Sequence, residues 1–373
     1  MSGALVDLVA KGVQDAYLTG NPEVSFFRQK YSRHTNFAMK PVKLVPQGTV
    51  GANSEISIKI PNKGDLLSYI WIDLNEDDLG QTNSIINANS TNPAIFELYI
   101  GGQLIDRQDA TFMALHWNKF LADSGAKAMI ASAVNTNDAT VRQNVLSGSL
   151  VPLHFFFCDS SPLPLVALQY HEVEIKVKFS SAVGSPALGY NFYANYVMLD
   201  THEREWFVNN DHELLIEQVQ RIPVTTGNDS NPVFDLSLLN HPVKSLMWTN
   251  PGSDEYYIRG GAMIYLNGTA LFNDEMPDKF FTYVQPYYHC ENGSELLKGG
   301  FGGGGGYSMK MYSFAQKVSK HIPTGACNFS RLDNAELKIR DQLNGTVNNV
   351  YLNAVNFNIL RIKKGMAGVA FSN

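Results

Sequence analysis

Short segments in which apolar and polar residues alternate dominate the chain. In 54–60, Ile56, Ile58 and Ile60 alternate with polar residues, and 172–179 shows the same pattern. A period of two places the apolar side chains on one face of a β-strand. Further strand-like segments, bounded by clusters of glycine, proline, asparagine and serine, are 67–74, 94–100, 150–157 and 193–199, with a comparable series after residue 213.

Helix-like patterns are few. Apolar residues recur at helical spacing in Leu5–Tyr17 and in Ala110–Ala122. The chain lacks the regular alternation of strand and helix that a parallel sheet requires. We therefore predict an all-β protein of antiparallel sandwiches or barrels with a few short helices.

Three short blocks occur twice in the same order, at offsets of 166, 162 and 161 residues. The matching pairs are Leu98–Gly102 with Ile264–Gly268, Glu174–Lys178 with Glu336–Arg340, and Asn195–Leu199 with Asn356–Leu360. A repeat of this length has the size of a domain rather than of a solenoid or propeller unit. The sequence predicts two tandem domains of one fold, and the number of strand-like segments in each favours an eight-stranded jelly roll.

Longer blocks resemble a known family. The segment 3–41, including Gln14–Pro22 and Arg33–Ala38, is similar to the start of the major capsid proteins of nucleocytoplasmic large DNA viruses, most nearly those of algal phycodnaviruses. Other blocks that resemble this family are 165–173, 215–218, 325–331 and 358–373. The resemblance therefore covers essentially the whole chain.

The resemblance implies a double jelly roll, in which two eight-stranded antiparallel sandwiches follow each other. We expect an N-terminal arm or helix in residues 1–25, a first jelly roll in 26–205 and a second in 206–373. The implied function is a structural major capsid protein. Its homotrimers would form pseudo-hexagonal capsomers in the icosahedral shell of a large double-stranded DNA virus.

The expected partners are further copies of the chain and neighbouring capsomers. The arm is predicted to contact minor capsid proteins at the inner face; packing on its own first domain is the alternative. Two other functions stay open from the sequence: a minor capsid paralogue, and a tandem jelly-roll protein that binds carbohydrate.

Charge argues against direct contact with nucleic acid. The formal net charge is −6, and lysines and arginines are scattered rather than massed in a stripe, as phosphate binding would require. The most basic stretch, Arg28–Lys43, is interpreted as a first strand with solvated charges; contact with an acidic partner or a membrane surface is the alternative.

Residues 1–12 lack the basic start and long apolar core of a signal peptide. No segment has the ~18 uncharged apolar residues of a transmembrane helix. Cys158, Cys290 and Cys327 are too few and too widely spaced for a disulfide framework or a paired metal site. We predict synthesis and assembly in the host cytoplasm and a final location in the virion.

Catalytic and cofactor motifs are incomplete in this sequence. His171-Glu172 has no second histidine at the zinc-protease spacing, and Asp73, Asn75 and Asp77 lack the glycine and glutamate of a calcium loop. His154, Asp159 and Ser160 lie in one segment without a nucleophile elbow. We predict no enzymatic activity, no cofactor and no metal.

Sequons mark candidate glycosylation sites, with unmodified asparagines in turns as the first interpretation for any one of them. Asn228 and Asn292 are predicted to be the most exposed, and Asn89 and Asn344 are further candidates. Asn267 and Asn328, which lie within the repeated or family-like blocks, are not expected to project outward.

Overall fold

The computed structural model describes residues 10–27, 31–74, 93–110, 112–124, 127, 150–180, 190–223, 232–249, 261–291, 309–340 and 351–372. The chain divides into two compact units, Met1–Asn36 and Phe37–Asn373. No helix within the described residues is long and apolar enough to cross a membrane.

The first unit contains one short helix among its described residues, α2 (Ala16–Thr19), and none of the residues of α2 is buried. The predicted helix Leu5–Tyr17 is therefore wrong over most of its described part, because residues 10–15 are not helical. Gly12 and Val13 are weak helix formers. A short helix that buries no apolar face is marginally stable at best.

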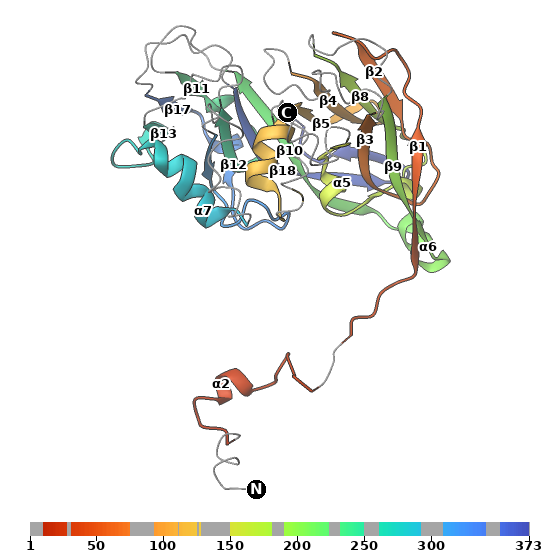
Figure 1. Cartoon of the computed structure of the whole chain (residues 1–373), viewed down its shortest axis with the longest axis horizontal. Coiled ribbons are helices and arrows are strands. Elements are labelled where there is room, and N and C mark those ends of the chain that lie inside the picture. Colours follow the sequence, from red (N-terminus) through yellow and green to blue (C-terminus); the bar gives the residue numbers. More distant parts are fainter. Residues whose placement is uncertain are drawn as a thin grey trace. The chain divides into compact units, whose positions relative to one another are not determined.

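The first sandwich consists of two antiparallel sheets (Figure 1). Sheet A has the order β1-β9-β3-β6, with β7 beside β3, and sheet B has the order β2-β8-β4-β5. The strands are β1 (Phe37–Leu44), β2 (Glu55–Lys59), β3 (Leu66–Leu74), β4 (Ile95–Ile100), β5 (Gln103–Asp109), β6 (Leu150–Pro152), β7 (Leu163–Pro164), β8 (Val173–Lys178) and β9 (Tyr190–Leu199).

The second sandwich repeats this arrangement. Sheet C has the order β10-β18-β12-β15, with β16 beside β12 and β19 beside β18, and sheet D has the order β11-β17-β13-β14. The strands are β10 (His212–Pro223), β11 (Val233–Asp235), β12 (Pro242–Thr249), β13 (Ala262–Leu266), β14 (Thr269–Ala270), β15 (Lys310–Ser313), β16 (Cys327–Asn328), β17 (Ala335–Ile339), β18 (Tyr351–Lys363) and β19 (Met366–Val369).

Both sandwiches have one topology. If the short strands β7, β16 and β19 are set aside, each half pairs its strands in the orders first-eighth-third-sixth and second-seventh-fourth-fifth. Two four-stranded antiparallel sheets connected in this way form a jelly roll. The predicted double jelly roll is confirmed.

The repeated sequence blocks lie on equivalent strands: β4 with β13, β8 with β17, and β9 with β18. The first block also specifies a tight turn. Gly101 and Gly102 connect β4 to β5 with positive φ, and Asn267 and Gly268 connect β13 to β14 in the same way. Two consecutive residues with positive φ suit the two-residue hairpin turn that matches strand twist.

The third block is shifted by one residue relative to the sequence match. Ala194 lies opposite Ile70 and Ala354 lies opposite Leu246, and each pair lies near a β-bulge. The structural offset is therefore 160 residues rather than the 161 of the sequence match. A slip of one residue matters because it exchanges the two faces of a strand.

Short helices connect the strands. They are η2 (Phe112–Leu121), α5 (Phe156–Asp159), η4 (Leu165–Ala167), α6 (Thr201–Asn209), η5 (Leu236–Leu238), η6 (Phe280–Val284), α7 (Gln285–His289) and η7 (Phe329–Arg331). The helix expected in Ala110–Ala122 is confirmed as η2. The strand expected in 150–157 is partly wrong, because β6 ends at Pro152 and the buried Phe156 and Phe157 begin α5. A short apolar run fits a buried helix as well as a strand.

Sheet C is apolar on both faces. Leu246 and Leu352 belong to the core between sheets C and D, whereas Met247 and Val355 belong to the apolar cluster shared with the first sandwich. The two sandwiches are therefore joined by a buried junction, and this junction also contains buried charged and polar groups.

Candidate functional site

Three elements of the first sandwich form the junction: β5, η2 and α5. In Figure 1, η2 is the orange helix between the two sandwiches. Strand β5 and helix α5 contact β10 of the second sandwich. The junction is thus formed by one edge of the first jelly roll and the outer face of sheet C.

Asp106 of β5 links the two sandwiches through its carboxylate. Its Oδ1 accepts hydrogen bonds from the backbone N–H of Val219 on β10 and of Arg107, each at 2.9 Å, and its Oδ2 accepts one from Gln108 Nε2 at 2.7 Å. Burial nevertheless raises the pKa of Asp106 to about 6. Three donors only partly offset the cost of removing this charge from water.

Asp109, at the end of β5, bridges the helix and the second sandwich. Its Oδ1 accepts from the backbone N–H of Phe112, 2.6 Å away, at the start of η2. Its Oδ2 lies 2.8 Å from Arg221 Nη1 on β10, and the Arg221 guanidinium lies 3.5 Å from the centre of the Tyr351 ring. The same carboxylate therefore holds both the start of η2 and a strand of the neighbouring sandwich.

His116 makes the third polar link. Asn353 Nδ2 on β18 donates to His116 Nδ1 at 3.0 Å, and both residues are fully buried. Burial, together with the charges of Lys119 and Arg221, lowers the pKa of His116 to about 3. The imidazole is therefore neutral at physiological pH, as its acceptor role requires.

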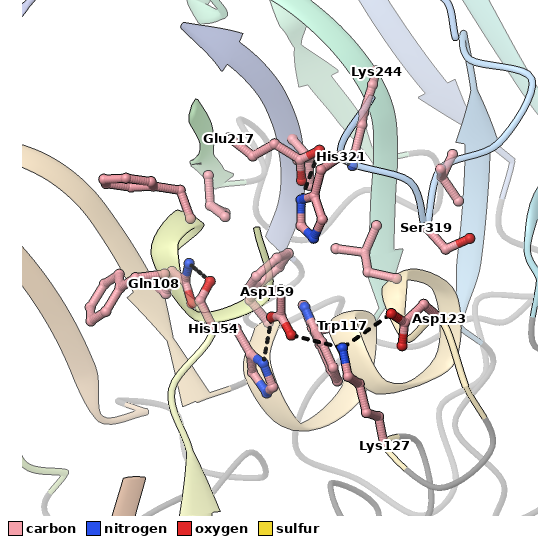
Figure 2. Close-up of a pocket in the computed structure, with 17 residues that line it drawn as sticks. Gln108, Trp117, Asp123, Lys127, His154, Asp159, Glu217, Lys244, Ser319 and His321 are labelled. Atoms are coloured by element: carbon pink, nitrogen blue, oxygen red, sulfur yellow. Dashed lines mark hydrogen bonds and ion pairs between the residues drawn. The ribbon is translucent and has the colours of Figure 1, made fainter. Parts of the chain in front are cut away.

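A small cavity lies within the junction (Figure 2). On its first-sandwich side, Lys127 Nζ lies 3.1 Å from both Asp123 Oδ2 and Asp159 Oδ1. His154 Nδ1 lies 3.6 Å from Asp159 Oδ2, and its ring stacks on Trp117 with the ring centres 3.5 Å apart. Burial alone would raise the pKa of Asp159, but His154 and Lys127 outweigh it and lower the pKa.

The second sandwich contributes its own charge cluster to the cavity. Glu217 Oε1 pairs with the buried Lys244 and lies 3.6 Å from His321 Nδ1. Burial alone would raise the pKa of Glu217, but the charges and hydrogen bonds of Lys244 and His321 outweigh it, so the pKa is lowered. Each cluster pairs its charges within its own sandwich, as buried charges require.

The geometry of this cavity does not assemble a known catalytic set. The Ser160 hydroxyl donates to the carbonyl of Phe156 at the start of α5 rather than to His154. The cavity volume is about 30 Å³, whereas ligand pockets measure roughly 300–1,000 Å³. Among the described residues, no three His, Cys, Asp or Glu side chains are grouped so that they could hold a metal ion.

A larger open groove of about 540 Å³ lies at the start of β3, beside α6. Asp65 in this groove accepts from the backbone N–H of Leu199 at 2.8 Å and pairs with Arg204 Nε at 2.8 Å. None of the described residues that line it is aromatic. The described lining of this groove therefore offers a sugar ring no aromatic face on which to stack.

The predicted glycosylation sites Asn89, Asn228, Asn292 and Asn344 all lie outside the described residues. Asn267 and Asn328 are exposed, contrary to expectation. Their side-chain oxygens accept backbone N–H groups, Asn267 from Asp333 and Asn328 from Ser330. Both asparagines therefore stabilise turns at the surface.

His171, considered above as a metal ligand, has a structural contact. Its Nδ1 accepts the backbone N–H of Ala367 on β19 at 3.0 Å. Of the calcium-loop residues, Asp73 lies on β3, and Asn75 and Asp77 lie outside the described residues.

Of the junction residues, His154 and Asp159 were considered from the sequence, whereas Asp106, Asp109 and His116 were not found from it. Asp106 and Asp109 lie on the mostly polar strand β5, and the largely apolar η2 begins three residues after Asp109. This combination signals a buried polar contact. It does not reveal that the partners are Val219 and Arg221, which lie more than a hundred residues away.

Comparison with known proteins agrees with the fold. Two family models match the chain: "Major capsid protein N-terminus" over residues 25–200 and "Large eukaryotic DNA virus major capsid protein" over residues 261–368. The major capsid proteins of Pyramimonas orientalis virus and of Paramecium bursaria Chlorella virus 1 are 35% and 30% identical, and each alignment covers 100% of both chains.

Solved structures give the same answer. A chain of the quasi-atomic model of the PBCV-1 virus capsid superposes with a TM-score of 0.74 and 26% identity, covering 94% of this chain and 100% of that chain. The Faustovirus major capsid protein, at 11% identity, covers 95% of this chain and 94% of its own with a TM-score of 0.65, which shows the shared fold. The duplicated topology and these matches define the class, the double jelly-roll viral capsid proteins. Within it, this chain belongs to the family of major capsid proteins of large eukaryotic DNA viruses, and the predicted family is confirmed.

Proposed function

We propose that three copies of this chain assemble into a pseudo-hexagonal capsomer and that these capsomers tile an icosahedral shell. The supporting observation is the duplicated jelly roll. Two sandwiches of one topology, joined by a buried junction, give each chain two similar edges. Three such chains supply six sandwiches, and repeated head-to-tail contacts between them close into a ring.

The proposed role is structural rather than catalytic. The charge clusters at the junction are paired internally, and the junction cavity is too small for a substrate. We place the boundary between the two jelly-roll domains within α6, which follows β9 and precedes β10. This position includes the expected boundary between residues 205 and 206.

The arm is proposed to bind minor capsid proteins at the inner face of the shell. Its described residues include large apolar side chains that are more than four-fifths exposed, among them Leu18, Phe26 and Phe27. Such side chains gain stability only when a partner covers them.

Assembly in the host cytoplasm and glycans on Asn89, Asn228, Asn292 and Asn344 are part of the same proposal. Peptide mapping of virion-derived protein tests the glycans.

Light scattering on the purified chain tests the trimer. We expect a native mass near three times the chain mass of 41.3 kDa over a range of protein concentrations. A mass that stays at one chain at all concentrations would contradict the proposal.

A further inference from the structure

The two sandwiches carry equivalent helical segments with different surroundings. In each half the segment follows the fifth strand and precedes the sixth. It spans 112–121 as η2 in the first half and 280–289 as η6 and α7 in the second, so that both cover ten residues. Residues separated by 168 positions are therefore equivalent.

In the second sandwich this segment has one buried and one exposed face. Phe281, Thr282, Gln285 and Pro286 are buried. The opposite face is apolar and aromatic but faces solvent, with exposed fractions of 51% for Tyr283, 41% for Val284, 72% for Tyr287 and 65% for Tyr288. Four neighbouring exposed side chains of this kind mark an interaction surface.

The equivalent face of η2 shows what such a surface binds. It includes His116 and Phe120, which are almost completely buried. His116 is hydrogen-bonded to Asn353 of sheet C, and Lys119, on the same face, interacts electrostatically with Asp278 of the second sandwich. In the first half, therefore, this face of the helix packs against the neighbouring jelly roll of the same chain.

The surface that would receive the second helix is also present. Sheet A is the equivalent of sheet C, and Trp71 lies opposite Tyr193 as Met247 lies opposite Asn353. Met247 and Asn353 are fully buried at the junction, whereas on sheet A Met39 is 58%, Phe37 52% and Tyr69 45% exposed. The centres of the stacked Trp71 and Tyr193 rings lie 5.2 Å apart.

We propose that the exposed face of η6 and α7 in one copy packs on the outer face of sheet A in a second copy. The contact would reproduce between copies the junction that η2 and sheet C form within one copy. Figure 1 shows α7 and β1 at opposite ends of the Phe37–Asn373 unit. One copy therefore cannot satisfy both surfaces by itself, and the contact is head-to-tail. This inference rests on the proposed trimer and identifies the surfaces that hold it together.

The test uses one variant for each surface and measures native mass by light scattering. Tyr287→Ser with Tyr288→Ser alters the helix side, and Phe37→Ser with Met39→Ser alters the sheet side. Truncation of a central aromatic side chain raises a dissociation constant by about tenfold or more. We expect each double variant to be monomeric where the unmodified chain is a trimer. The matched control, Leu238→Ser with Val208→Ser, removes two exposed apolar side chains elsewhere and should remain trimeric.

Mixing the two variants separates a head-to-tail contact from loss of folding. Each variant keeps one intact surface, so the mixture should form dimers through the single complementary pair. Two variants that are folded by circular dichroism but fail to pair would contradict the head-to-tail contact. If the helix-side and the sheet-side double variants both remain trimeric, this inference is overturned while the proposed trimer stands. A monomeric unmodified chain would instead contradict the proposed function itself.

Discussion

At the scale of single residues, the buried Asp106 makes stability depend on pH. Its pKa is about 6 in the folded chain, against about 3.9 when unfolded. The folded state therefore holds this proton more tightly than the unfolded state does. The contribution of Asp106 to stability is greatest below pH ~4 and is lost as the pH rises through ~6, by roughly 3 kcal/mol in total.

The variant Asp106→Asn tests this sign. Its amide oxygen still accepts from Val219 and Arg107, and the side chain stays neutral at every pH. We expect the difference in free energy of unfolding between the variant and the unmodified chain to increase by about 2.5 kcal/mol, in favour of the variant, between pH ~4 and pH ~7.5. Chemical denaturation of both proteins at each pH measures their difference in free energy of unfolding. The substitution also alters the contact with Gln108, but this effect is the same at both pH values and cancels when the two differences are subtracted.

Asp159→Asn is the matched variant, for which we expect the opposite dependence of stability on pH. The pKa of Asp159 is lowered in the folded chain, so its ionised form stabilises the fold above the unfolded pKa, and that stability is lost as the pH falls through the folded pKa. This variant should be less stable than the unmodified chain at neutral pH, with the deficit disappearing in acid. If the curves of both variants run parallel to that of the unmodified chain, neither carboxylate is linked to folding in this way.

At the scale of elements, the turn between β4 and β5 connects local geometry to the junction. Gly101 and Gly102 both have positive φ, of 59° and 80°. A Cβ on Gly101 would collide with the His171 ring, whereas one on Gly102 would meet no atom within 4 Å. His171 accepts the backbone N–H of Ala367 from the second sandwich. Gly101 therefore leaves room for a side chain that contacts the second sandwich, whereas Gly102 is required only by its own backbone conformation.

We expect Gly102→Ala to cost about 1–2 kcal/mol from backbone strain alone. Gly101→Ala should cost about 1–3 kcal/mol more, because a displaced His171 leaves the Ala367 N–H without its acceptor. Denaturation midpoints of the two variants give this difference. Equal midpoints would mean that the contact between His171 and Ala367 contributes nothing to stability.

At the scale of the whole molecule, the two units are expected to have separate functions. Val42 and Leu44, both on β1, are the first residues along the chain that belong to the apolar clusters of the described structure. The described residues of the Met1–Asn36 unit are almost all exposed. The described part of the arm therefore adds nothing to the apolar cores that stabilise the sandwiches.

Deletion of residues 1–25 tests this separation. We expect the thermal unfolding midpoint to stay unchanged, because no described core residue is removed. The shortened chain should still form a trimer, whose mass falls only by that of the deleted residues. Assembly of complete shells with minor capsid proteins should be lost. Calorimetry and light scattering measure the first two quantities, and electron microscopy of assembled particles measures the third. A fall in the unfolding midpoint would show that the arm packs on its own domain, and normal shells would show that it has no role in assembly.

Much of the fold could be predicted from local sequence. The alternation of Ile56, Ile58 and Ile60 identified a strand, and the repeated blocks located three pairs of equivalent strands. Errors arose where one pattern fits two structures. The apolar run that contains Phe156 and Phe157 fits a strand and a helix equally well, and its burial in α5 follows from contacts with distant segments.

The sequence by itself determined the duplication, the strand-rich class and the family, because alternation, repeats and long matching blocks are properties of the chain that need no coordinates. Only the tertiary structure decided which residues of β9 and β18 are equivalent, the pairing of Asp106 and Asp109 with β10, and which helical face is left exposed. These features depend on segments more than a hundred residues apart meeting in space. Aromatic residues at equivalent positions, Phe120 and Tyr288, are buried in η2 and exposed in α7, because only η2 has a second sandwich of its own chain to cover it.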